Sequence, residues 1–301
     1  DGRRAYLSSR DCGLSWKLHY SSPQAMGECT YVPQAQKYMR VWTDTKDSTG
    51  TWILSSTSGP DDTHFTRTLV SHRLYNDCFS ISQSRYTSRL YATGQVANPS
   101  DSRISDPVFV FSDDYGQTWD TVLMPTPPIY PVTAPDLSSR WAYCGVEPVV
   151  TETAPNQMMA LLRNASTSFY WTFSRDNGTT WSSLSVSPFH GDATTPYLLT
   201  LRDGRVLAFW NNTVPLPEND HSAPELDEDA KSGRWEDAFS NRDASHVAIS
   251  EDGGRTWTGA RELLLSVIRD RSDFRYYGSM ESSHDKSVHQ FQAIELPFGK
   301  I

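Results

Sequence analysis

Charged side chains stand at the ends of apolar segments in the second half of the chain. Glu147 begins one such segment, Arg163 ends the next, and Arg242 lies just before a third. Guanidinium groups bind carboxylates bidentately and stay charged at any working pH, so two of them beside a carboxylate would make a clamp for an anion. The same residues could equally form structural ion pairs, and spacing alone leaves both interpretations open.

Two histidines point to a second kind of chemistry. His190 is followed by Gly191 and Asp192, and His289 is followed by Gln290, each pair lying in a connection between apolar segments. An imidazole titrates near neutral pH and can act as a base, although a single surface histidine is more often incidental. No His or Cys spacing predicts a metal site.

A repeated octapeptide indicates how these residues are positioned. The pattern Ser-x-Asp-x-Gly-x-Ser/Thr-Trp is intact at 9–16, 112–119, 174–181 and 250–257, and a degenerate copy fits around 58–66. Asp or Ser can accept backbone N–H bonds across a tight turn, Gly supplies a positive φ, and Trp packs on the neighbouring strand. We therefore interpret the octapeptide, an Asp box, as a folding device without a catalytic role.

Short alternating segments around the boxes predict an all-β protein. The strands are expected at 78–84, 89–95 and 107–113, at 147–152, 158–164, 168–174 and from 182, at 197–202, 206–212 and 245–250, and from 289 to 296. Units of four strands and roughly 50 residues have the size of propeller blades. With an opening half-unit and a poorer unit over 29–74, the count is six blades, or five if the two ends share one blade.

The antiparallel order of such a unit determines which residues can meet. The start of the first strand, the end of the second and the start of the third share one rim, and the Asp box lies on the opposite rim. Glu147, Arg163, Arg242, His190 and His289 all fall on the first rim. The acidic insertion over 213–241 overhangs that rim, either as a solvated loop or as a lid that could bind calcium.

Composition excludes several classes of protein. The 301 residues carry 27 Lys and Arg against 36 Asp and Glu, a net charge of −9 with no long basic run, which argues against nucleic-acid binding. No apolar stretch reaches the roughly 20 residues of a transmembrane helix. Four cysteines without a CxxC pair permit up to two disulfides: Cys12, Cys29, Cys78 and Cys144. A single domain over 1–301 is expected, with its first and last strands beyond the ends.

The sequence resembles the sialidase (neuraminidase) superfamily of β-propellers over nearly its whole length. The resemblance is carried by the Asp boxes, by Glu147-Pro-Val-Val with Met158-Met-Ala-Leu-Leu-Arg163 before a box, and by Asn241-Arg242 running into the last box. In this family three arginines hold the sialic-acid carboxylate, a Tyr assisted by a Glu is the nucleophile, and an Asp is the acid/base. The resemblance implies Glu147 as the Glu, and Arg163 and Arg242 as the second and third arginines.

One position departs from the family pattern. The nucleophilic Tyr is expected at the start of the last unit, where this sequence has Ser287-Val-His289-Gln290-Phe291. Tyr276 and Tyr277 lie about a dozen residues earlier and are the alternative nucleophiles. Asp192 and Gln290 are candidate substrate-binding residues on the same connections as the two histidines.

The sequence therefore predicts a sialidase-like exo-glycoside hydrolase that releases a terminal acidic sugar from a glycan, without a cofactor. Two alternatives remain: a propeller-fold polysaccharide lyase or glycosidase acting on uronate-containing chains through His190 or His289, and a glycan-binding propeller without activity. The substrate class, rather than a targeting signal, suggests a secreted or extracytoplasmic location.

Overall fold

The computed structural model shows an all-β protein made of antiparallel sheets, as predicted. It describes every residue except 1–3, 23, 28, 45–49, 77–79, 102–103, 129–145, 164–167, 192–194, 213–244, 264–290 and 300. The helical content of the described residues is the single 3-10 turn η6 (Pro297–Gly299), and none of these residues forms a helix that could span a membrane. The described residues divide into two compact units.

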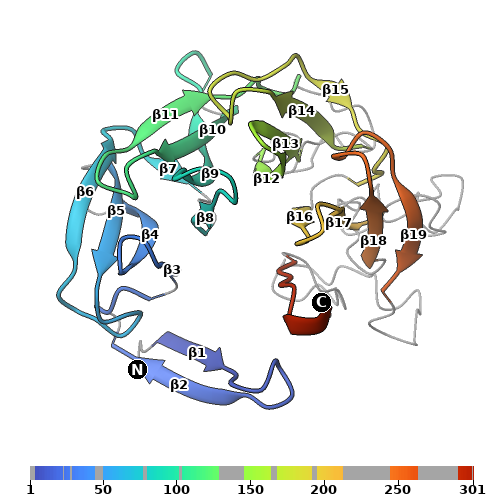
Figure 1. Ribbon diagram of the computed structural model, residues 1–301. Coiled ribbons are helices and arrows are strands. Elements are labelled where there is room, and N and C mark those ends of the chain that lie inside the picture. The colour runs from blue at the N-terminus through green and yellow to red at the C-terminus, as the bar shows by residue number, and fades with distance from the viewer. Residues whose placement is uncertain are drawn as a thin grey trace, which may run out of the picture. The chain divides into compact units, whose positions relative to one another are not determined.

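The first unit comprises 1–96, 108–123 and 295–301. It begins with a hairpin of β1 (Arg4–Ser8) and β2 (Lys17–Ser21). A four-stranded sheet follows in chain order: β3 (Thr30–Val32), β4 (Lys37–Asp44), β5 (Gly50–Ser56) and β6 (Thr66–Ser71) (Figure 1). The next sheet contains β7 (Tyr75–Asn76), β8 (Ser82–Gln83), β9 (Leu90–Ala97), β10 (Ser105–Ser112) and β11 (Asp120–Leu123).

The second unit comprises 97–107 and 124–294 and contains two four-stranded sheets. One consists of β12 (Val149–Ala154), β13 (Gln157–Leu162), β14 (Tyr170–Ser174) and β15 (Ser185–Val186). The other consists of β16 (Tyr197–Thr200), β17 (Val206–Asn211), β18 (Ser245–Ser250) and β19 (Thr258–Glu262). Their first strands lie against each other, and the Thr151 and Thr200 hydroxyls form a buried hydrogen bond of 2.8 Å.

These sheets confirm the predicted strand order of the described repeats, with two differences. In place of the single strand expected at 78–84 there are two short strands, β7 before residues 77–79 and β8 after them. β7 pairs with the end of β9, and β8 pairs with its start. The strand expected from 289 to 296 is not formed over its described part, 291–296, because no described strand provides a hydrogen-bonding ladder for it. The numbers of blades and domains stay predictions.

Burial falls from the inner strands of each sheet to its last strand. All six residues of β17 are buried, and so are the last five of β13, whereas β15 and β19 are exposed at every position. A strand covered on both faces carries apolar residues continuously instead of in alternation. This explains the run Met158-Met-Ala-Leu-Leu162, which lacks the alternation of a half-buried strand.

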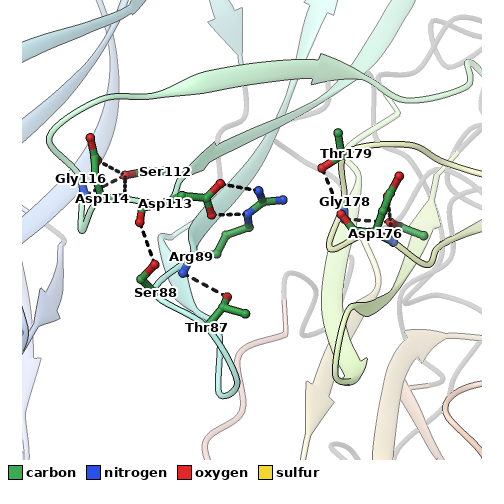
Figure 2. Close-up of polar contacts among 11 residues, drawn as sticks. Thr87, Ser88, Arg89, Ser112, Asp113, Asp114, Gly116, Asp176, Gly178 and Thr179 are labelled. Carbon is green, nitrogen blue, oxygen red and sulfur yellow. Dashed lines mark hydrogen bonds and ion pairs between the residues drawn. The ribbon is translucent and has the colours of Figure 1, made fainter.

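The four Asp boxes share one set of hydrogen bonds. In each, the Ser hydroxyl donates to the Asp at 2.8 Å and accepts from the Gly N–H at 2.7–2.8 Å, and the indole N–H of Trp donates to the Gly carbonyl at 3.0–3.1 Å. Figure 2 shows the contacts of the Ser hydroxyl around Ser112, Asp114 and Gly116, and those around Asp176 and Gly178. The predicted positive φ is confirmed at all four glycines, and the residue before each glycine also has a positive φ.

The second box is held by an additional ion pair. The Arg89 guanidinium donates two hydrogen bonds to Asp113, at 2.7 and 2.6 Å (Figure 2). Its Cζ lies 4.1 Å from the centre of the Phe111 ring. This bidentate pairing fixes the turn to the start of β9.

Two box glycines contact a methionine of the preceding sheet. A Cβ built on Gly116 would lie 2.8 Å from Sδ of Met39, and one built on Gly254 would lie 2.3 Å from Sδ of Met159. Met39 and Met159 are both the third residue of the second strand in their sheets. The boxes therefore pack neighbouring sheets together at equivalent positions.

The packing predicted for the box tryptophans is found in some boxes and not in others. Trp119 is 8% exposed, whereas Trp16 is 62% exposed. Trp16 belongs to the β1–β2 hairpin, in which β1 has β2 as its sole partner among the described strands. The hydrogen bond to the Gly carbonyl forms in both boxes, so it does not depend on burial of the indole.

The box aspartates should make stability depend on pH in the acid range. Hydrogen bonds from the Ser15 side chain and backbone and from Ser9 lower the pKa of Asp11 to about 2, and those from Thr256 and Ser250 lower the pKa of Asp252. A carboxyl whose pKa is lower in the folded state stabilises the fold above its unfolded pKa of about 3.9, and this contribution disappears as pH falls through the folded value.

We expect the urea midpoint of the wild type to decrease as the pH is lowered from about 4 to about 2. The urea midpoint of Asp252→Asn should depend less on pH in that window. Asp120→Asn, at an exposed position outside the boxes, is the control for a lost charge. Parallel pH profiles for the wild type and Asp252→Asn would contradict the prediction.

Candidate functional site

The predicted rim of the β12–β15 sheet brings Glu147 and Arg163 together. Glu147 lies two residues before β12, and Arg163 directly follows β13. Because β12 and β13 are antiparallel, with Val149 opposite Leu161, these two residues stand at the same end of the sheet. The backbone N–H of Arg163 donates to the carbonyl of Val146 at 2.9 Å and extends the pairing to that end.

The two side chains form a buried ion pair. Nη2 of Arg163 lies 2.8 Å from Oε1 of Glu147, and the side chains are 8% and 13% exposed respectively. Removing either partner would leave a buried charge without its oppositely charged partner. Both the anion clamp and the structural ion pair of the sequence analysis fit this contact, which orients the guanidinium fork of Arg163.

The backbone at Glu147 is strained. Its φ is 28°, a value that residues other than glycine rarely adopt. Such conformations persist where the surrounding structure determines them, and they occur often at functional sites. The strained residue is also the one that pairs with Arg163.

A third residue, which the sequence analysis missed, comes from the neighbouring sheet. The Thr195 hydroxyl donates a short hydrogen bond to Oε2 of Glu147, and Thr195 is 4% exposed. Thr195 precedes β16, on the same connection as His190 and Asp192. No motif marks Thr195; the available signal was its place on a connection that reaches the predicted rim.

His190 is exposed and lies beside the start of β14. Its Nδ1 is 3.4 Å from the hydroxyl of Ser168, its partner among the described residues. Ser168 itself is 7% exposed. The structure therefore places His190 on the predicted rim, where it contacts Ser168.

The connection that carries His190 and Thr195 passes closely between the two sheets. A Cβ on Gly191 would lie 2.6 Å from the Phe169 ring and 2.9 Å from the carbonyl oxygen of Asn211, so only glycine fits here without displacement. Phe189 is 2% exposed and packs against Trp210 and Trp257 of the second sheet, at ring-centre distances of 4.8 and 4.9 Å. These contacts fix the path of the connection on either side of His190.

The other candidates fall outside the described residues: Arg242, Asp192, Tyr276, Tyr277, His289, Gln290 and the acidic insertion with its calcium proposal. Whether they join Glu147 and Arg163 stays a prediction. Across the described part of the chain, no three His, Cys, Asp or Glu side chains are grouped closely enough to hold a metal ion.

Comparison with solved structures finds sialidase-like folds. A protein of unknown function from Dyadobacter fermentans is similar with a TM-score of 0.54 and 14% identity, covering 87% of this chain and 71% of that one. The Hadza microbial sialidase Hz136 is similar with a TM-score of 0.52 and 15% identity, covering 85% of this chain and 51% of that one. NanB sialidase from Streptococcus pneumoniae gives a TM-score of 0.47 and 15% identity over 71% of this chain, which spans only 29% of NanB.

Comparison of the sequence identifies a family but no individual curated relative. No curated protein matches this sequence. The family model for the BNR repeat-like domain matches residues 29–276, a range that includes three of the four intact Asp boxes and the Glu147–Arg163 pair. The chain therefore belongs to the BNR repeat-like domain family.

Proposed function

We propose that this protein is a sialidase-like glycoside hydrolase that releases a terminal acidic sugar from glycans. The observation that carries the proposal is the buried Glu147–Arg163 pair at the predicted rim, which holds a guanidinium in one orientation. Family membership and the fold shared with Hz136, a protein described as a sialidase, support it.

The proposed chemistry begins with recognition of a carboxylate. A guanidinium presents five N–H donors in a planar fork, and carboxylates accept two of them in parallel. Glu147 holds Arg163 so that little conformational freedom is lost when the ligand binds. By the family resemblance, Arg242 would complete the clamp and Tyr276 or Tyr277 would be the nucleophile assisted by Glu147.

A second candidate function rests on His190. This histidine is exposed on the same rim, and its Nδ1 is next to the Ser168 hydroxyl. In a lyase acting on uronate-containing chains, an arginine would neutralise the carboxylate and an imidazole would take the C5 proton. Either reaction implies a glycan partner, and an extracytoplasmic location follows from that substrate class.

The test compares hydrolysis of a fluorogenic sialoside with the absorbance of unsaturated uronates released from acidic polysaccharides. We expect sialoside hydrolysis by the wild type, and a loss of about a hundred-fold or more in kcat/KM for Arg163→Ala, because a charge-assisted bidentate contact is removed. Arg205→Ala is the matched control, since Arg205 forms an exposed pair with Asp203.

The outcomes separate the candidates. Sialoside hydrolysis that Arg163→Ala abolishes and Arg205→Ala preserves would support the proposal. Absorbance growth that requires His190 would support the lyase instead. No activity in either assay, with binding of acidic sugars, would overturn both proposed activities and leave a glycan-binding protein.

A further inference from the structure

The Glu147 carboxylate is held from two different sheets. Its Oε1 contacts Arg163, which follows β13, and its Oε2 accepts from Thr195, which precedes β16. The first contact lies within one sheet, and the second joins that sheet to the next. Thr195 therefore reaches the carboxylate that pairs with Arg163 from a sheet other than the one that carries the pair.

We propose that Thr195 is a positioning residue, which fixes the Glu147 carboxylate and thereby aims the Arg163 guanidinium at the carboxylate of an acidic sugar. The proposal rests on the function proposed above. It adds a specificity-determining element from the neighbouring sheet, through the contact of Thr195 with Glu147.

The surroundings of Thr195 are suited to this role. Thr195 is 4% exposed, so its hydroxyl is held by packing and not by solvent. Before Thr195 in the chain, Gly191 passes so close to Phe169 and Asn211 that only glycine fits at its position without displacement. A buried donor can hold a carboxylate whose own backbone is strained, as at Glu147.

The chemistry favours positioning over direct contact with the ligand. A hydroxyl that donates to a carboxylate strengthens the charged form and restricts its rotation. The carboxylate then accepts from the guanidinium in one geometry, and the fork of the guanidinium is aligned before the ligand arrives. Losing the donor should weaken anion binding without removing any charge from the site.

The experiment compares Thr195→Val with Thr195→Ser and Thr200→Val in the full chain. Valine keeps the shape and removes the hydroxyl, serine retains it, and Thr200→Val removes a buried hydroxyl between the same two sheets away from Glu147. Binding of N-acetylneuraminate is measured by calorimetry. We expect affinity to fall about tenfold in Thr195→Val, because a hydrogen bond to a charged group is lost, and to stay within about threefold in the other two variants.

A second measurement does not depend on the proposed function. NMR of the Arg163 side chain reports rotation of its guanidinium, which we expect to be faster in Thr195→Val than in the wild type or Thr200→Val. If the wild type binds no acidic sugar, the proposed function fails, and this rotation still tests the positioning. Unchanged rotation and unchanged affinity in Thr195→Val, or equal losses in Thr200→Val, would overturn the proposal.

Discussion

Gly254→Ala is expected to lower the free energy of unfolding by about 2–5 kcal/mol. The φ of Gly254 is 86°, and an L-residue in this left-handed region costs about 1–2 kcal/mol. The added Cβ would lie 2.3 Å from Sδ of Met159, which is fully buried and cannot move aside without displacing its neighbours. Overpacking of this kind costs about 1–3 kcal/mol more.

Gly204→Ala separates the two contributions. The φ of Gly204 is 92°, and nothing lies within 4 Å of its would-be Cβ, so this variant has the backbone strain without the steric overlap. Urea unfolding of both variants gives the cost of the contact between sheets as the difference. The loss of unfolding free energy caused by Gly254→Ala should also be smaller when Met159 is replaced by alanine in the same chain. Equal losses in Gly254→Ala and Gly204→Ala would show that the box glycine is required only for its φ.

Glu147→Ala is expected to destabilise the protein by about 3–5 kcal/mol, because it leaves the buried Arg163 charge without its carboxylate. Glu147→Gln should cost less, since it keeps the volume and some hydrogen-bonding capacity. Urea unfolding at neutral pH measures both. The double variant Glu147→Ala with Arg163→Ala should cost less than the sum of the single variants, since no charge is then left unpaired.

Asp203→Ala is the matched control for this prediction. Asp203 pairs with Arg205 at 2.6 Å, but both side chains are about half exposed, at 51% and 45%. Exposed pairs contribute about 0–1 kcal/mol because water screens them. If Glu147→Ala cost no more than Asp203→Ala, the Glu147–Arg163 pair would have to be accessible to water in solution.

The repeat made the fold predictable from the sequence. The Asp box is a local device: its Ser, Asp and Gly form their hydrogen bonds within eight residues, so the octapeptide specifies its own turn. Each turn fixes a strand on either side, and the apolar segments between turns give the remaining strands. Positions for Glu147 and Arg163 follow because antiparallel pairing brings the start of one strand beside the end of the next.

The contacts between sheets were not predictable in this way. Thr195 is 48 residues from Glu147, and a single threonine before a strand carries no signal for a particular carboxylate. The same holds for Gly254 against Met159 and for the ring of Phe189 between Trp210 and Trp257. These contacts depend on which faces of two sheets meet and at what separation.

By itself, then, the sequence determined the all-β class, the box turns, the strand order of the described repeats and the meeting of Glu147 with Arg163, because each arises from hydrogen bonds between neighbouring segments. Only the tertiary structure decided that Thr195 completes the pair, that Glu147 has a strained backbone and that His190 contacts Ser168. Those features result from side-chain packing between strands distant in the chain, which local propensity and periodicity do not encode.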